Sequence, residues 1–135
     1  MTGGNTMNQG RILVVDDNPV NLKLAQMTLR LAGYEVGGAT DGTEAMAATA
    51  DFRPDLILMD IQLPGMDGLE VTRRLKGDPH TSSTRIIALT AYAMKGDEAR
   101  ALAAGCDGYL TKPIDTRTLP DVVAGYLAPH PALGR

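Results

Sequence analysis

The chain has 135 residues, 44% of them hydrophobic and 21% charged, which is typical of a single globular domain. The net charge of −3 and the lack of a basic stretch argue against nucleic-acid binding. The start of the chain has no signal-peptide apolar region, and the apolar runs are far shorter than the ~20 residues of a membrane span. Cys106 is the only cysteine, so no internal disulfide can form, and we expect a cytoplasmic protein without a membrane partner.

The folded domain is expected to span residues 11–127, between two tails. Residues 1–10 are polar and glycine-rich, which predicts a disordered N-terminal tail. Pro129 and Pro131 prevent a helix from continuing, so residues 128–135 are predicted to form a C-terminal tail.

The domain begins with a strand, a helix and a second strand. The apolar run 12–15 predicts a parallel strand buried on both faces. Asn18-Pro19 then provides a helix cap and a proline at the first helical position, and the helix is predicted over residues 20–32. One apolar stripe runs along this helix: Val20, Leu24, Met27 and Leu31. A weak strand follows at residues 34–39, and its two glycines place it at an edge of the sheet.

The second and third helices are predicted by a shared capping pattern. An aspartate in the cap followed three residues later by glutamate resembles a capping box. The two copies are Asp41-Gly42-Thr43-Glu44 and Asp67-Gly68-Leu69-Glu70. Between them the apolar run 56–59 predicts a third strand, and the third helix is expected to end near Lys76.

The last third of the domain continues the alternation. A strand, a helix and a strand are expected at residues 86–89, 94–104 and 108–111. A fifth helix is indicated by apolar residues at a helical period: Leu119, Val122, Val123, Tyr126 and Leu127. Either Asp115 or Thr118 caps this helix, and Pro120 fits the first turn only if Thr118 is the cap. Five strand–helix repeats predict a doubly wound α/β domain.

Polar groups follow four of the predicted strands where each strand ends. They are Asp16 and Asp17, Asp60, Thr90 and Lys112. Each is commonplace alone, since an acid after a strand is often only a helix cap. Ligands of open α/β sheets bind at the carboxyl ends of the strands, so the matching positions predict one site.

The chemistry of this set suits a divalent metal and a phosphoryl group. Two carboxylates about 4 Å apart repel by about 4 kcal/mol at an effective dielectric constant of 20, so a cation is needed. Hard oxygen ligands favour Mg²⁺. Lys112 supplies a positive charge and Thr90 a hydroxyl donor, while Asp60 is the candidate nucleophile toward phosphorus.

Four segments resemble the receiver domain of two-component response regulators. They are residues 12–18, 58–68, 89–93 and 108–113, which contain the strand-end groups named above. The segment 91–98 is most similar to single-domain regulators of the DivK kind and to receivers attached to hybrid kinases. The resemblance implies a flavodoxin-like, five-stranded parallel sheet in the order 2-1-3-4-5 with five helices.

The resemblance also implies a role for each site residue. Asp60 would accept a phosphoryl group from the phosphohistidine of a histidine kinase or a histidine phosphotransfer protein. Asp17 would ligate Mg²⁺ directly, Asp16 would hold it through water, and the backbone carbonyl of Gln62 would complete the protein ligands. Lys112 would pair with the phosphoryl oxygens, and its bond to the following proline is expected to be cis.

The same resemblance implies a switch. Thr90 would move toward the phosphoryl group, and Tyr109 would turn into the space that Thr90 leaves. The output would be altered binding of a downstream protein at the face formed by the fourth helix, the fifth strand and the fifth helix. Gln62 and Tyr92 are placed to tune the lifetime of the phosphorylated state, and we expect the Tyr92 ring to exclude water.

Two alternative functions remain open at this point. The chain could be a receiver excised from a hybrid histidine kinase, which the motifs do not distinguish from a stand-alone regulator. It could instead be a Mg²⁺-dependent phosphatase that forms an aspartyl-phosphate. Haloacid-dehalogenase-like phosphatases need a second acid two residues after the nucleophile, and Gln62 occupies that position here. The sequence therefore favours a protein that is not an enzyme and catalyses only its own phosphorylation and dephosphorylation.

Overall fold

A computed structural model describes residues 10–90 and 96–127. Five parallel strands form one sheet in the order β2-β1-β3-β4-β5, which confirms the predicted fold and the edge position of the second strand. The strands are β1 (Arg11–Val15), β2 (Glu35–Ala39), β3 (Leu56–Asp60), β4 (Arg85–Thr90) and β5 (Gly108–Thr111). The predicted tails, apart from Gly10, lie outside the described residues, as does Tyr92.

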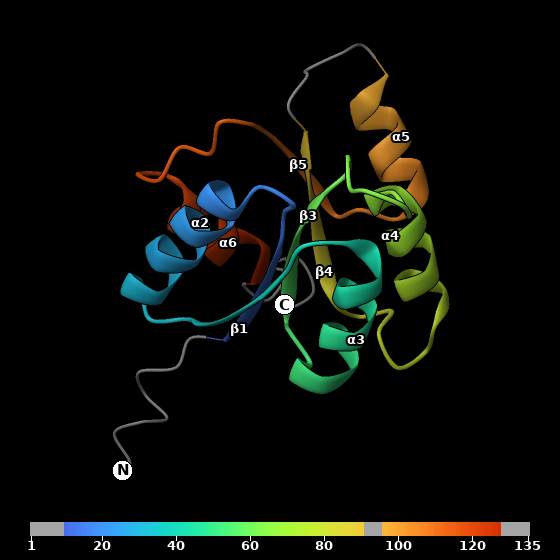
Figure 1. Ribbon diagram of the computed structural model, residues 1–135, viewed down its shortest axis with the longest axis horizontal. Coiled ribbons are helices and arrows are strands. Elements are labelled where there is room, and N and C mark those ends of the chain that lie inside the picture. Colours follow the sequence, from blue (N-terminus) through green and yellow to red (C-terminus); the bar gives the residue numbers. More distant parts are fainter. Residues whose placement is uncertain (1–9, 91–95, 128–135) are drawn as a thin grey trace, which may run out of the picture.

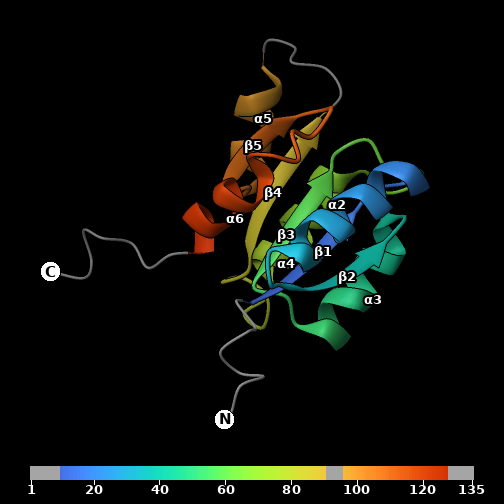
Figure 2. The same cartoon turned by 90° about the vertical axis from the view of Figure 1, so that its left-hand side faces the viewer.

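Helices cover both faces of the sheet, as Figures 1 and 2 show. They are α2 (Pro19–Leu31), α3 (Gly42–Phe52), α4 (Gly68–Gly77), α5 (Asp97–Ala104) and α6 (Leu119–Leu127). Helices α2 and α6 lie on one face, and α3, α4 and α5 lie on the other (Figure 1). Each face has its own apolar cluster, because alternate residues of the central strands point to opposite sides. No helix in the described part of the chain is long and apolar enough to cross a membrane.

The predicted helix caps are formed by local hydrogen bonds. The side chain of Asn18 accepts the backbone N–H groups of the second and third residues of α2. Asp41 and Asp67 each accept the backbone N–H of the glutamate three residues later, at 2.8 and 2.9 Å. The second hydrogen bond of the predicted capping boxes, from the backbone N–H of the capping aspartate to the glutamate side chain, is wrong. Glu44 accepts the backbone N–H of Thr40 rather than that of the capping aspartate, and Glu70 pairs with two arginines of its own helix.

The starts of the last two helices add to the sequence prediction: α5 begins later than predicted, and α6 begins at one of the two places that the sequence left open. Helix α5 begins at Asp97, later than predicted, after Gly96 in a left-handed conformation with φ of +97°. Helix α6 begins at Leu119, and the carbonyl of Thr118 accepts the N–H of Val122, so Thr118 holds the cap position. Pro120 therefore lies in the first turn, where the N–H that proline lacks needs no intrahelical partner.

The apolar stripe that indicates α2 in the sequence faces solvent. Its members are Val20, Leu24, Met27 and Leu31, exposed by 72%, 48%, 51% and 88%. The helix instead packs on the sheet through Ala25 and Leu29, which are almost fully buried. Helix α2 thus has two apolar sides, one of which is left open at the surface.

Candidate functional site

Three carboxylates meet at the carboxyl edge of the sheet. Strand β1 ends immediately before Asp16, and β3, its direct neighbour, ends in Asp60; the strand register pairs Val15 with Met59. One oxygen from each of Asp16, Asp17 and Asp60 lies within 4.8 Å of the others. Asp16 and Asp60 are buried, and Asp17 is exposed at the rim. The structure therefore brings together the three acids that the sequence singled out.

Asp60 is only 2% exposed and is held on both oxygens. Its Oδ1 accepts the backbone N–H of Gln62 at 2.9 Å, and its Oδ2 accepts a hydrogen bond from Nζ of Lys112 at 2.9 Å. Burial, the largest effect, raises the pKa of the Asp60 carboxyl, and the charge of Asp16 adds to it. The hydrogen bonds from Lys112 and Gln62 oppose this rise without cancelling it. The site thus holds a desolvated carboxylate at the end of a strand.

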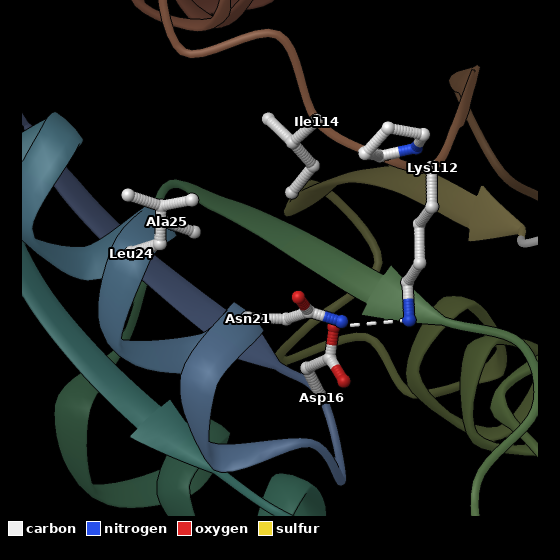
Figure 3. A pocket seen from close by; sticks show the side chains of 7 residues that line it. Asp16, Asn21, Leu24, Ala25, Lys112 and Ile114 are labelled. Atoms are coloured by element: carbon white, nitrogen blue, oxygen red, sulfur yellow. Dashed lines mark ion pairs between the residues drawn. The ribbon is translucent and has the colours of Figure 1, made fainter.

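Lys112 bridges two of the carboxylates. Its Nζ lies 2.9 Å from Oδ2 of Asp60 and 3.0 Å from Oδ2 of Asp16, and the second ion pair is the dashed line in Figure 3. Burial alone would lower the pKa of the Lys112 ammonium, but the two carboxylates outweigh burial and raise that pKa. Lys112 is therefore a fixed cation here. The Lys112-Pro113 peptide bond is cis, as predicted.

The remaining predicted residues lie around this centre. Thr90, 1% exposed, is the last residue of β4, and its carbonyl accepts the backbone N–H of Lys112 at 2.7 Å. The side chain of Gln62 is exposed. Tyr109 of β5 is partly buried against the apolar cluster under α3, α4 and α5. Desolvation and the charges of two acids of α5 raise the pKa of Tyr109, so its hydroxyl is near that helix.

A pocket of about 350 Å³ opens beside the carboxylates, between α2 and the segment after β5. Figure 3 shows Asp16 and Lys112 at one end, with side chains of α2 facing Ile114 across the opening. The lining residues from α2 and from the segment after β5, such as Asn21, Leu24 and Ile114, are not among the predicted site residues. A signal existed for Asn21, because it follows the Asn18 cap by about one helical turn and so lies near the end of β1.

The donor set fits a divalent cation. Three carboxylates face one ammonium, which leaves the centre with two net negative charges. Within the described chain, Oδ2 of Asp16 is buried and has no hydrogen bond, although the ion pair with Lys112 partly compensates it. Oxygen ligands of this kind are those that Mg²⁺ prefers. The acidic triad is typical of the magnesium-binding site of receiver domains.

The fold and the acidic centre define a receiver domain. Residues 12–124 match the family described as the response regulator receiver domain, and the chain belongs to this family. It is 44% identical over 116 residues to the polar-differentiation response regulator DivK of Brucella anthropi, which covers 86% of this chain and 94% of that relative. The chain is thus a DivK-like receiver of two-component signalling.

Solved structures agree with this assignment. The receiver domain of the sensor histidine kinase PA1611 from Pseudomonas aeruginosa PAO1 matches with a TM-score of 0.80 and 38% identity, covering 87% of this chain and 97% of that chain. That structure has a magnesium ion coordinated in its active-site cleft. A CheY-like receiver domain protein from Methanospirillum hungatei JF-1 matches with a TM-score of 0.80 and 32% identity, covering 87% of this chain and 92% of that chain.

Proposed function

We propose that this chain is a phosphoacceptor switch that takes a phosphoryl group on Asp60 from the phosphohistidine of a histidine kinase or a histidine phosphotransfer protein. The observation that carries the proposal is the buried Asp60 carboxylate, aligned by Lys112 and grouped with Asp16 and Asp17. A carboxylate oxygen of Asp60 forms the new bond to phosphorus. The phosphorus–nitrogen bond of the donor breaks, and its electron pair stays on the imidazole. Such transfer depends mostly on positioning and charge stabilisation.

The neighbouring residues supply charge and hydrogen bonds. Asp16, Asp17 and Asp60, with the backbone carbonyl of Gln62, are the residues that would hold Mg²⁺. Bound Mg²⁺ would offset the carboxylate repulsion and neutralise charge on the phosphoryl oxygens. Lys112 already lies 2.9 Å from an Asp60 oxygen, so its ammonium is placed to pair with oxygens added there. On this proposal the receiver is not an enzyme for other substrates and catalyses only its own phosphorylation and dephosphorylation.

The switch that we propose connects the site to the surface of α5, β5 and α6. Thr90 ends β4 beside Asp60, and its hydroxyl would turn toward a phosphoryl group. Tyr109 lies on the adjacent strand and is only partly buried, so its ring can move inward when Thr90 moves. The displaced ring alters the surface that a downstream protein binds. We further propose that the chain acts as a stand-alone, cytoplasmic regulator.

The donor is proposed to dock along α2. The exposed stripe from Val20 to Leu31 has the 4-3-4 spacing of a helix-packing seam, and one of its members, Leu24, also lines the pocket beside Lys112. The charged residues of α2 are Lys23 and Arg30, with no acid. The occupant that fits is a helix of the phosphodonor with an apolar seam and acidic flanks, its histidine placed over Asp60.

Labelling tests the chemistry of the proposed function. Acetyl phosphate or a phosphorylated kinase is expected to label the wild type only with Mg²⁺, and EDTA or Asp60→Asn is expected to abolish the label. Asp51→Asn, an exposed substitution on α3, is the control and should be labelled normally. Label that persists on Asp60→Asn would refute the assignment of the phosphoacceptor, and turnover of small phosphate esters would favour the phosphatase alternative.

A matched pair of leucines tests the docking surface. Leu24 on α2 and Leu102 on α5 are exposed by 48% and 49%. In a transfer profile against the histidine kinases of the source genome, we expect Leu24→Glu to slow transfer from the preferred donor at least tenfold. The same variant should be labelled by acetyl phosphate at the normal rate, and Leu102→Glu should behave like the wild type in both assays. Equal loss in both variants, or none, would contradict docking on α2.

A further inference from the structure

Helix α4 begins directly on the backbone of the proposed phosphoacceptor. Gly68 is the first residue of α4, and a Cβ atom at this position would overlap the carbonyl oxygen of Asp60. The same Cβ would lie 2.8 Å from Cα of Ile61 and 2.9 Å from the carbonyl carbon of Asp60. Contacts this short do not occur in packed proteins. The position therefore admits no side chain unless the Asp60 backbone and the start of α4 move apart.

Space, rather than backbone conformation, requires glycine here. Gly68 is not among the residues with positive φ, so an L-residue could adopt its backbone angles. Its N–H donates to the carbonyl of Ile61 at 3.3 Å, and its own carbonyl accepts the hydroxyl of the buried Thr72 at 2.8 Å. Glycine disfavours a helix, so its presence in the first turn has a local cost that close packing explains.

The same contact closes the loop of residues 61–67. Gln62 is the second residue of this loop, and its N–H donates to Oδ1 of Asp60. At the far end of the loop, a Cβ at Gly42, the first residue of α3, would lie 3.1 Å from the carbonyl oxygen of Met66. The loop is thus bounded by two helix starts, each an Asp-Gly pair, that approach its backbone without a side chain between them.

We propose that Gly68 is a positioning residue that fixes the main chain of Asp60 and Gln62, and so aims the acceptor carboxylate and the Gln62 carbonyl. This inference rests on the proposed function of Asp60. Gly68 does not touch the phosphoryl group and acts only through the backbone it contacts. In Gly68→Ala the Asp60 carbonyl and the start of α4 must separate by about 1 Å, and a displacement of that size at the acceptor can lower a rate by about 100-fold.

The test compares three substitutions in the same helix. Gly68→Ala is expected to be phosphorylated by acetyl phosphate and Mg²⁺ about 100-fold more slowly per folded molecule. Gly77→Ala ends the same helix with no atom within 4 Å of the new methyl group, and it should be labelled like the wild type. Leu75→Val removes buried volume at a residue that is 3% exposed. It therefore controls for a loss of stability in Gly68→Ala that is unrelated to the Asp60 backbone.

A second readout needs neither metal nor phosphate. In metal-free protein, the amide NMR signals of Ile61 and Gln62 should shift in Gly68→Ala and stay in place in Leu75→Val. If the wild type is not labelled at Asp60, the proposed function fails while this readout still tests the backbone contact. Unmoved amide signals, or labelling of Gly68→Ala within twofold of the wild type, would overturn the inference.

Gly42→Ala keeps the inference testable if Gly68→Ala does not fold. The neighbours of its new methyl group lie 3.0 to 3.2 Å away, so they need to move by only a few tenths of an ångström to make room for it. We expect this variant to fold, to shift the Gln62 amide signal and to bind Mg²⁺ several-fold more weakly by calorimetry. An unchanged amide signal and unchanged affinity would overturn the role given to the loop.

Discussion

Neutralising the adjacent carboxylates Asp16 and Asp17 should change the stability of the metal-free protein in opposite directions. Asp17 is exposed, and one of its oxygens lies within 4.8 Å of oxygens of two other carboxylates. At the dielectric constant of water each such repulsion is worth about 1 kcal/mol at most. Asp17→Asn should therefore stabilise the metal-free fold by about 0.5–1 kcal/mol at low salt, since exposed charges are well screened.

Asp16 differs because its charge is buried and paired. It is 1% exposed, its Oδ2 lies 3.0 Å from Nζ of Lys112, and its Oδ1 accepts the N–H of Asn18 at 2.9 Å. Removing one partner of a buried ion pair costs about 3–5 kcal/mol. Lys112 keeps Asp60 as a partner, and the repulsion between Asp16 and Asp60 is relieved. We therefore expect Asp16→Asn to destabilise the fold by about 1–2 kcal/mol.

Urea unfolding followed by circular dichroism in EDTA measures both changes. Asp51→Asn is the control, and an exposed substitution of this kind should stay within about 0.5 kcal/mol of the wild type. Shifts of the same sign for Asp16→Asn and Asp17→Asn would refute the reasoning from burial. With saturating Mg²⁺ the stability advantage of Asp17→Asn over the wild type should disappear. The cation stabilises the wild type by binding to it, and the variant lacks one of the proposed ligands.

Three further outcomes are expected. Thr90→Ala should be labelled but should leave the ring of Tyr109 unmoved when beryllofluoride is added, and wild-type-like NMR shifts would contradict the role of the hydroxyl. Lys76→Met removes an ammonium 2.9 Å from Asp107 while keeping an apolar stem, and should lower the unfolding free energy by about 1–2 kcal/mol in urea titrations. Tyr92→Ala should shorten the phosphorylated lifetime several-fold, and a lifetime as long as that of the wild type would exclude the ring as a water shield.

Features of the fold that depend on near neighbours in the sequence were predictable. The caps at Asn18, Asp41 and Asp67 use hydrogen bonds to residues two or three positions away, so the local sequence contains both partners. The strand ends at Asp16 and Asp60 follow from short apolar runs that stop at a polar residue. Order within the sheet came from the family resemblance, because short apolar runs do not specify their neighbours.

The orientation of α2 was not predictable from periodicity. The helix has one apolar side at Val20 and Leu24, and another at Ala25 and Leu29. Both repeat at a helical period, so the pattern shows a helix without showing which side faces the sheet. Ala25 and Leu29 are buried because they pack with apolar residues of β1 and β2 in one cluster. Contacts of this kind exist only once the chain has folded.

Lys112 connects the site to the surface that is proposed to respond. In the metal-free site its ammonium is held by Asp60 and Asp16, while its backbone N–H donates to the carbonyl of Thr90. A phosphoryl group on Asp60 removes the carboxylate charge that Lys112 neutralises and adds oxygens at nearly the same place. On the proposed function the ammonium would exchange partners without a large movement, and this exchange would be felt first at the ends of β4 and β5, which the Lys112 backbone joins. Tyr109 lies on β5 against α5, so the first element to sense the new charge adjoins the helix that is proposed to carry the signal.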